Sequence, residues 1–164
     1  QLIRLLIKKE HNVKVILTEN AKEFVTPLTL STVSKNPVLT NFSSPEGNWH
    51  SHVELALWAD AMLIAPATAN TIAKLANGLA DNMVTSTALA LPTHTKKVLA
   101  PAMNTQMYEN PITQQNIDRL KLTGWKTIEP REAILACGDQ GKGALAEIDT
   151  IIDTVKELIY EKTI

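Results

Sequence analysis

The sequence has few of the residues that mark several common classes of protein. Its 164 residues include one cysteine, six glycines and 4% aromatic residues. A single cysteine cannot form a disulfide within the chain, so a domain held together by internal disulfides is excluded. The sequence also lacks the apolar run of roughly 18 residues that a membrane-spanning helix needs, and no signal-peptide pattern is visible. We therefore expect a soluble cytoplasmic protein with no membrane partner.

The charges of the chain nearly cancel, at a formal net charge of −1. No basic run is longer than the pairs Lys8-Lys9 and Lys96-Lys97, so we expect no nucleic-acid partner. The length and a hydrophobic content of 45% predict one domain over residues 1–164. Because the chain begins at Gln1 inside a helical pattern, we expect a first strand and a phosphate-binding turn upstream of it.

Short apolar runs of strand length alternate with helical patterns along the chain. The predicted strands are residues 12–18, 60–67, 96–102 and 124–130. The predicted helices are residues 1–10, 52–59, 69–80, 111–124 and 149–162, and residues 131–146 are predicted to be a loop. This alternation predicts an α/β fold, a three-layer Rossmann-like parallel sheet with helices on both faces.

Three segments that follow predicted strands are rich in small residues, hydroxyls and amides. They are residues 18–24, 66–71 and 101–111. Ligands of doubly wound sheets bind beyond the carboxyl ends of the strands, where such segments let the backbone approach a ligand closely. Each segment alone is equally consistent with a tight turn, with Asn70 as a helix cap. The three together favour a ligand site.

Among the four histidines, His52 begins an apolar helical pattern that leads into a predicted core strand. That position lets a side chain reach a cleft, although a cap or surface role is the more common one for such a histidine. His50 and His52 alternate as they would on one face of a strand, which makes a metal site an alternative. No His-x-x-x-His or Cys-x-x-Cys spacing completes a ligand set, so we expect no metal.

Residues 135–147, LACGDQGKGALAE, contain the only cysteine and three of the six glycines. Their spacing fits neither a phosphate loop nor a dinucleotide-binding fingerprint. The glycines favour hinges of a mobile flap that carries Cys137 over a pocket. An inert thiol, buried or at the surface, is the simpler alternative from the residues alone.

Four motifs, in this order over nearly the whole chain, resemble those of the homo-oligomeric flavin-containing cysteine decarboxylases: HVELALWAD, PATANT, PAMNTQMYENP and ACGDQGKGALAE. The ending GALAE is similar to the stand-alone enzymes of that family rather than to those fused to a synthetase domain. The resemblance implies a flavodoxin-like fold that binds FMN. It also implies assembly into homotrimers, sometimes grouped further into a dodecamer.

The resemblance implies roles for individual residues as well. His52 matches the active-site histidine, Asn104 the residue that holds the substrate carboxylate, and Cys137 the thiol of the substrate-covering flap. The positions that match flavin contacts are Thr18, Phe24, Thr68, Ala69, Asn70, Thr71 and Ala102. Those that match substrate contacts are Asn104, Ala136 and Gly138.

The activity that the resemblance implies is FMN-dependent decarboxylation of 4′-phospho-N-pantothenoylcysteine to 4′-phosphopantetheine in coenzyme A biosynthesis. The carbanion left by a simple cysteine carboxylate has no electron sink, so the thiol would first be oxidised to a thioaldehyde. After CO₂ leaves, the enethiol would be reduced again, with Cys137 supplying a proton. Two alternatives stay open, a peptidyl-cysteine decarboxylase of lantibiotic maturation and a non-catalytic flavin-binding regulatory subunit. A flavin prenyltransferase of related fold is disfavoured by the PAMN and ACGD motifs.

Overall fold

A computed structural model describes residues 1–43, 49–134, 138 and 140–160. The chain divides into two compact units. The first unit is Gln1–Trp58 with Ala80–Pro92, and the second is Ala59–Leu79 with Thr93–Ile164. The single domain expected over residues 1–164 stays a prediction.

The first unit pairs two short parallel strands, β1 (Val15–Ile16) and β2 (Val38–Leu39). Its helices are α1 (Leu2–Lys8), the 3₁₀ helix η1 (Glu19–Glu23), α2 (Pro27–Ser34), α3 (His52–Trp58) and α5 (Met83–Leu89). Helix α5 begins at a capping box, because the Asn82 side chain accepts the backbone N–H of Thr85 and the Thr85 hydroxyl accepts the backbone N–H of Asn82.

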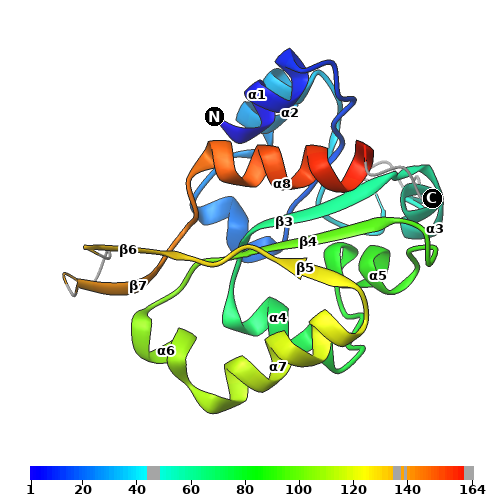
Figure 1. The fold of residues 1–164 in the computed structure, drawn as a ribbon. Helices are drawn as coiled ribbons and strands as arrows, with labels where there is room; N and C mark the ends of the chain where they lie inside the picture. The colour runs from blue at the N-terminus through cyan, green and yellow to red at the C-terminus, as the bar shows by residue number, and fades with distance from the viewer. Residues whose placement is uncertain (44–48, 135–137, 139, 161–164) are drawn as a thin grey trace. The chain divides into compact units, whose positions relative to one another are not determined.

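The second unit is built on a parallel sheet in the order β3 (Ala61–Ala67), β4 (Lys96–Pro101), β5 (Trp125–Thr127). Helix α8 (Ile148–Tyr160) covers one face, and α4 (Ala69–Ala76) and α7 (Pro111–Leu122) cover the other (Figure 1). The central strand β4 is buried from Val98 to Pro101, as expected for a strand covered on both faces. This unit is therefore a three-layer arrangement with its core on both sides of β4.

The α/β class with parallel strands and flanking helices is confirmed. The five predicted helices are present with somewhat shorter bounds, and three of the predicted strands form β3, β4 and β5. The strand predicted over residues 12–18 is only two residues long in the structure, Val15–Ile16. Strand β2 and helices α2, α5 and α6 (Thr105–Glu109) were not predicted.

The loop predicted over residues 131–146 is wrong. Strands β6 (Arg131–Ile134) and β7 (Gln140–Ala144) form an antiparallel hairpin there. Glycine is usually depleted in strands, which hid β7 from the sequence pattern. In β7 the absence of a side chain is required, because a Cβ on Gly143 would overlap the Met103 carbonyl oxygen and one on Gly141 would overlap the Thr105 side chain. These two glycines permit close packing and are not the predicted hinges.

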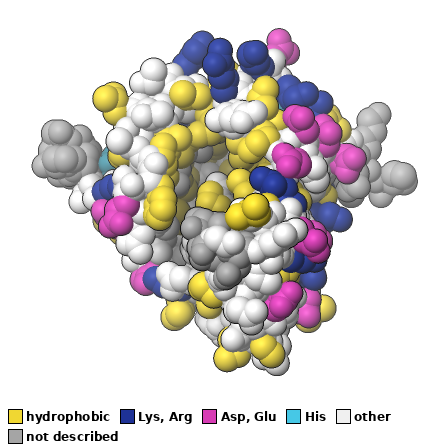
Figure 2. Space-filling view, turned by 90° about the vertical axis from the view of Figure 1, so that its left-hand side faces the viewer, with side chains coloured by type: hydrophobic (Ala, Val, Ile, Leu, Met, Phe, Trp, Pro, Cys, Tyr) yellow, Lys and Arg dark blue, Asp and Glu magenta, His cyan; other side chains and the backbone are white. Residues whose placement is uncertain are grey.

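Several large hydrophobic side chains remain exposed in both units, and Figure 2 shows hydrophobic side chains gathering on one face. The most exposed are Phe24, Leu28, Ile112, Leu122 and Ile134. Over the described residues, none of the helices is both long and apolar enough to cross a membrane.

Candidate functional site

Two of the predicted ligand segments lie side by side at the carboxyl edge of the parallel sheet. Strands β3 and β4 are neighbours, with Ala67 paired to Pro101. Beyond that pair, the Ala102 N–H donates to the Ala67 carbonyl at 3.1 Å. The Thr68–Thr71 turn and the Ala102–Asn104 segment therefore start from adjacent points of the sheet edge.

The Thr68–Thr71 turn forms the N-terminus of α4. The Thr68 hydroxyl caps the helix by accepting the Thr71 N–H at 3.3 Å, and the two hydroxyl oxygens are 3.3 Å apart. Thr68 and Asn70 are exposed, and Ala69 between them is small. The turn thus offers hydroxyl, carboxamide and backbone N–H groups, a set that fits the polar ring edge or the phosphate of a flavin.

Asn104 is held by the helix that it begins. Its Oδ1 accepts the backbone N–H of Gln106 at 2.9 Å and that of Met107 at 3.4 Å, at the start of α6. Because Oδ1 faces the helix, the orientation of the side-chain amide is fixed, with Nδ2 as its donor end. A neutral donor held in this way suits a carboxylate ligand.

The β6–β7 hairpin lies against both sequence neighbours of Asn104. The Met103 N–H donates to the Gly143 carbonyl at 2.9 Å, and the Thr105 side chain lies beside Gly141. Of the predicted flap residues, Gly138 adopts a φ of +89° in open space. Ala136 and Cys137 lie outside the described residues.

A carboxylate joins the hairpin to helix α6. Glu129 Oε2 accepts the Tyr108 hydroxyl at 2.9 Å and the Lys142 Nζ at 2.6 Å, and Lys142 Nζ lies 5.4 Å from the centre of the Tyr108 ring. The hydrogen bond from Lys142 lowers the pKa of Glu129 below its ordinary value. Burial, with the Glu129 carboxylate nearby, raises the pKa of Tyr108 to about 12.

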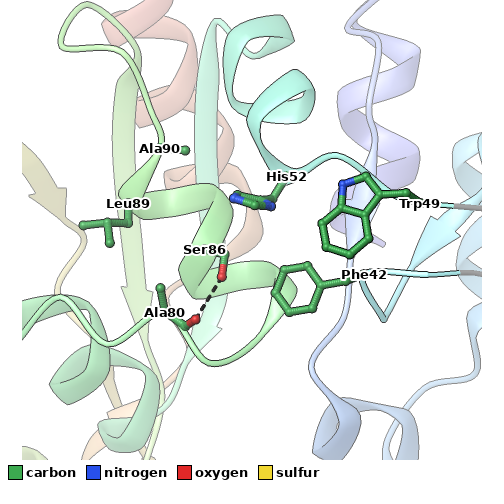
Figure 3. A pocket seen from close by; sticks show the side chains of 7 residues that line it. All are labelled: Phe42, Trp49, His52, Ala80, Ser86, Leu89 and Ala90. Atoms are coloured by element: carbon green, nitrogen blue, oxygen red, sulfur yellow. Dashed lines mark hydrogen bonds between the residues drawn. The ribbon is translucent and has the colours of Figure 1, made fainter.

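His52 lies in the first unit, at the first residue of α3, and lines a cavity of about 450 Å³ (Figure 3). The centres of the Phe42 and His52 rings are 5.7 Å apart, and these two rings meet edge to face. The centres of the Phe42 and Trp49 rings are 5.8 Å apart, and these two rings are stacked. The other lining residues are Ala80, Ser86, Leu89 and Ala90. Within the described part of the chain, the buried Nδ1 of His52 has no hydrogen-bond partner. The lining of this pocket is therefore largely apolar, with the imidazole ring of His52 among aromatic and aliphatic side chains.

The remaining predicted flavin contacts also belong to the first unit. Thr18 follows β1 and precedes η1, where its hydroxyl makes no capping bond to the helix. Phe24 ends η1 and is 90% exposed. The structure thus brings Thr68–Thr71 together with Ala102 and Asn104 in the second unit, and it holds Thr18, Phe24 and His52 in the first.

Sequence reasoning missed five residues around these sites. Phe42 and Trp49 line the His52 cavity, and Tyr108, Glu129 and Lys142 join α6 to the hairpin. The scarcity of aromatic residues was a usable signal for the first two. Nothing in the sequence marks Glu129 and Lys142 as partners, because their contact depends on the unpredicted hairpin. No three His, Cys, Asp or Glu side chains of the described ranges gather into a possible metal site.

A parallel sheet with such turns along its carboxyl edge is typical of α/β proteins that bind ligands at that edge. The sequence matches the family model described as Flavoprotein over residues 1–160. The chain belongs to the flavoprotein family.

Two curated relatives and two solved structures illustrate the similarity. The chain is 54% identical over 153 residues to the probable phosphopantothenoylcysteine decarboxylase of Streptococcus mutans, covering 93% of this chain and 86% of that protein. It is 45% identical over 163 residues to the coenzyme A biosynthesis bifunctional protein CoaBC of Haemophilus influenzae, covering 99% of this chain and 40% of that protein. The chain thus spans less than half of the bifunctional relative.

Among solved structures, the chain resembles a cysteine-to-serine mutant of PPC decarboxylase complexed with pantothenoylaminoethenethiol. The TM-score is 0.82 at 32% identity, over 94% of this chain and 86% of that one. It also resembles the FMN-dependent cysteine decarboxylase SpaF, with a TM-score of 0.78 at 31% identity over 93% of this chain and 83% of that one. Both similarities extend over nearly the whole chain.

Proposed function

We propose that the protein is an FMN-dependent decarboxylase that converts 4′-phospho-N-pantothenoylcysteine to 4′-phosphopantetheine in coenzyme A biosynthesis. The observation that carries the proposal is the capped Asn104, which follows β4 at the same edge of the sheet where the Thr68–Thr71 turn follows β3. The similarity to the S. mutans protein, 54% over 93% of the chain, supports the same substrate.

FMN is proposed as the cofactor because the polar groups along the sheet edge fit it. The residues that we propose to contact the flavin are Thr18, Phe24, Thr68, Ala69, Asn70, Thr71 and Ala102. Bound FMN would supply the two-electron redox chemistry that loss of CO₂ from a cysteine-derived carbon requires. We also propose a homotrimer, sometimes grouped into a dodecamer, and the exposed hydrophobic side chains support self-association.

Each proposed catalytic residue has a separate task. Asn104 would donate to the substrate carboxylate without the strong charge stabilisation of an arginine, so that the ground state is not favoured over the departing state. His52 would orient the substrate thiol and assist its deprotonation, which agrees with its unpartnered Nδ1. Cys137, with Ala136 and Gly138 as neighbouring substrate contacts, would give the proton that completes the saturated thiol.

The test of the function is product analysis by mass spectrometry. The full chain is purified, saturated with FMN and incubated in parallel with 4′-phosphopantothenoylcysteine and with a cysteine-ending peptide. We expect loss of CO₂ and a saturated thiol from the first substrate only. An enethiol from the peptide would identify the peptidyl-cysteine decarboxylase instead. Bound flavin without turnover of either substrate would identify a non-catalytic flavin-binding subunit.

The role of Asn104 is tested by Asn104→Asp. Aspartate caps a helix as well as asparagine does, so α6 should keep its start. The new charge would repel the substrate carboxylate, and we expect kcat/KM to fall by at least about 100-fold, the size of a close like-charge contact near a protein surface. Asn110→Asp is the matched control, because Asn110 caps α7 in the same way, with Oδ1 accepting the Ile112 N–H at 2.9 Å. Equal turnover of the two variants would show that Asn104 acts only as a helix cap.

A further inference from the structure

We propose that Glu129 and Lys142 are positioning residues, which fix strand β7 against helix α6 and thereby hold Asn104 in place for the substrate carboxylate. The inference rests on the proposed function, since it concerns the residue that would grip the substrate. Neither Glu129 nor Lys142 belongs to the set of residues proposed to touch substrate or flavin.

Three segments of the chain meet at one carboxylate oxygen atom. Glu129 Oε2 accepts the Tyr108 hydroxyl from α6 and the Lys142 ammonium from β7. Glu129 lies 21 positions after Tyr108 and 13 positions before Lys142 in the sequence. Hydrogen bonds to an ionised carboxylate are shorter and stronger than neutral ones, so a single carboxylate joins helix and strand.

Tyr108 connects this carboxylate to Asn104. Tyr108 lies one helical turn after Asn104, and its N–H donates to the Asn104 carbonyl at 2.9 Å. The Tyr108 side chain is only 5% exposed, so its ring cannot turn away from the interior without leaving its packing. A displacement of Tyr108 would therefore carry the start of α6, and Asn104, with it.

Strand β7 is also attached to the residue directly before Asn104. The Met103 N–H donates to the Gly143 carbonyl at 2.9 Å, directly before Asn104. Strand β7 is thus attached on both sides of Asn104, by a backbone bond at Met103 and through the Glu129 carboxylate at Tyr108. Loss of the Glu129 attachment leaves the strand fixed near Asn104 by the Met103 bond and by its pairing with β6, and the end of the strand that faces Tyr108 is held less firmly.

Lys142 is the residue to change, because its side chain is 38% exposed and its removal leaves the Glu129 carboxylate, 58% exposed, in contact with water and the Tyr108 hydroxyl. Pairs this exposed contribute little to global stability, so the variant should fold. Lys142→Met removes the charge and keeps the length of the side chain, and Lys142→Arg restores the charge. Lys121→Met is the matched control, since Lys121 also pairs with an exposed carboxylate of the second unit, Asp118, at 3.1 Å.

The kinetic test compares KM and kcat for 4′-phosphopantothenoylcysteine. A misplaced Asn104 loses binding that ground state and transition state share, which raises KM and leaves kcat unchanged. We expect KM to rise about three- to ten-fold in Lys142→Met, which corresponds to the free energy of one partly exposed hydrogen bond to a charged group. In Lys142→Arg, KM should return to the wild-type value. Lys121→Met should match the wild type. A lower kcat at unchanged KM would indicate only a loss of folded enzyme and would overturn the proposal.

A second readout does not depend on activity. Amide hydrogen exchange of residues 140–144 should accelerate in Lys142→Met and stay at the wild-type rate in Lys121→Met. If the wild type does not decarboxylate the substrate, the proposed function fails, and the exchange rates still decide whether Lys142 anchors the strand. Unchanged exchange in Lys142→Met would overturn the anchoring, whatever the activity of the wild type.

Discussion

Phe24 leaves 90% of its surface exposed at the end of η1, in a chain with only two phenylalanines. A ring this exposed contributes little to folding, since substitutions of surface residues usually change stability by less than about 0.5 kcal/mol. Any effect of truncating it therefore reports on a ligand or a partner. The proposed ligand contact is the flavin.

We expect Phe24→Ala to weaken FMN binding by up to about ten-fold, which corresponds to the loss of one aromatic contact. Titration of the apoprotein with FMN, followed by the quenching of flavin fluorescence, measures the dissociation constant. Leu122→Ala is the control, because Leu122 is 88% exposed at the end of α7. The same affinity in Phe24→Ala and wild type would remove Phe24 from the flavin contacts, provided that both proteins unfold at the same urea concentration.

His52 illustrates how far a single residue could be interpreted from the sequence. Its place at the start of a helical pattern was predicted correctly, and the structure adds a buried Nδ1 that lacks a partner among the described residues. A buried polar atom without a hydrogen bond costs about 1–3 kcal/mol, so the position of this nitrogen is unfavourable for folding alone. The scarcity of aromatic residues draws attention to Phe42 and Trp49, but no local pattern predicts that their rings stack beside His52.

At the scale of elements, strand β7 contains two glycines that pack closely against different kinds of group. A Cβ on Gly143 would meet the Met103 carbonyl oxygen, which belongs to the backbone and cannot move alone. A Cβ on Gly141 would meet the Thr105 side chain, which can be truncated. The two positions therefore predict different outcomes for the same substitution.

We expect Gly141→Ala and Gly143→Ala each to lower the free energy of unfolding by about 1–3 kcal/mol, as overpacking does. Adding Thr105→Ala should recover most of the loss in Gly141→Ala and none of it in Gly143→Ala. Urea unfolding followed by circular dichroism measures all five proteins, including Thr105→Ala alone. Recovery in both double variants, or in neither, would contradict the packing of β7 against the segment that follows β4.

The elements predicted correctly are those with a strong local pattern. Helix α7 begins with a proline and ends before Gly124, and α8 buries Ile151, Ile152 and Val155 at helical spacing. Helix α5 was missed because five consecutive residues from Met83 to Thr87 are buried, which removes the contrast between an apolar and a polar face. The hairpin was missed because its glycines are selected by tertiary contact and disfavoured by local propensity.

At the scale of the whole molecule, the sequence predicted the strands after which the candidate site residues lie, and it did not predict the contacts that hold those residues in place. The rule that ligands bind at the carboxyl edge of a parallel sheet located Thr68–Thr71 and Asn104 correctly at adjacent strand ends. The contact of Glu129 with Tyr108 and Lys142 joins residues that are distant in sequence, so no spacing rule applies to it. The roles of the site residues stay predictions.

The dependence of stability on pH gives a whole-molecule test of the burial of Tyr108 beside Glu129. Unfolded Tyr108 loses its proton near the ordinary pKa of 10.0, while burial and the Glu129 carboxylate raise the folded pKa to about 12. Between these values the unfolded state binds fewer protons than the folded state, so stability falls as pH rises, by up to about 1.4 kcal/mol per pH unit.

Tyr108→Phe cannot ionise and should lose this part of the slope, although its stability at neutral pH is lower. Tyr160→Phe is the control, because the chain has only these two tyrosines. Urea unfolding at intervals from pH 9 to pH 12 measures the slopes, and parallel curves for wild type and Tyr108→Phe would show that Tyr108 ionises equally in both states.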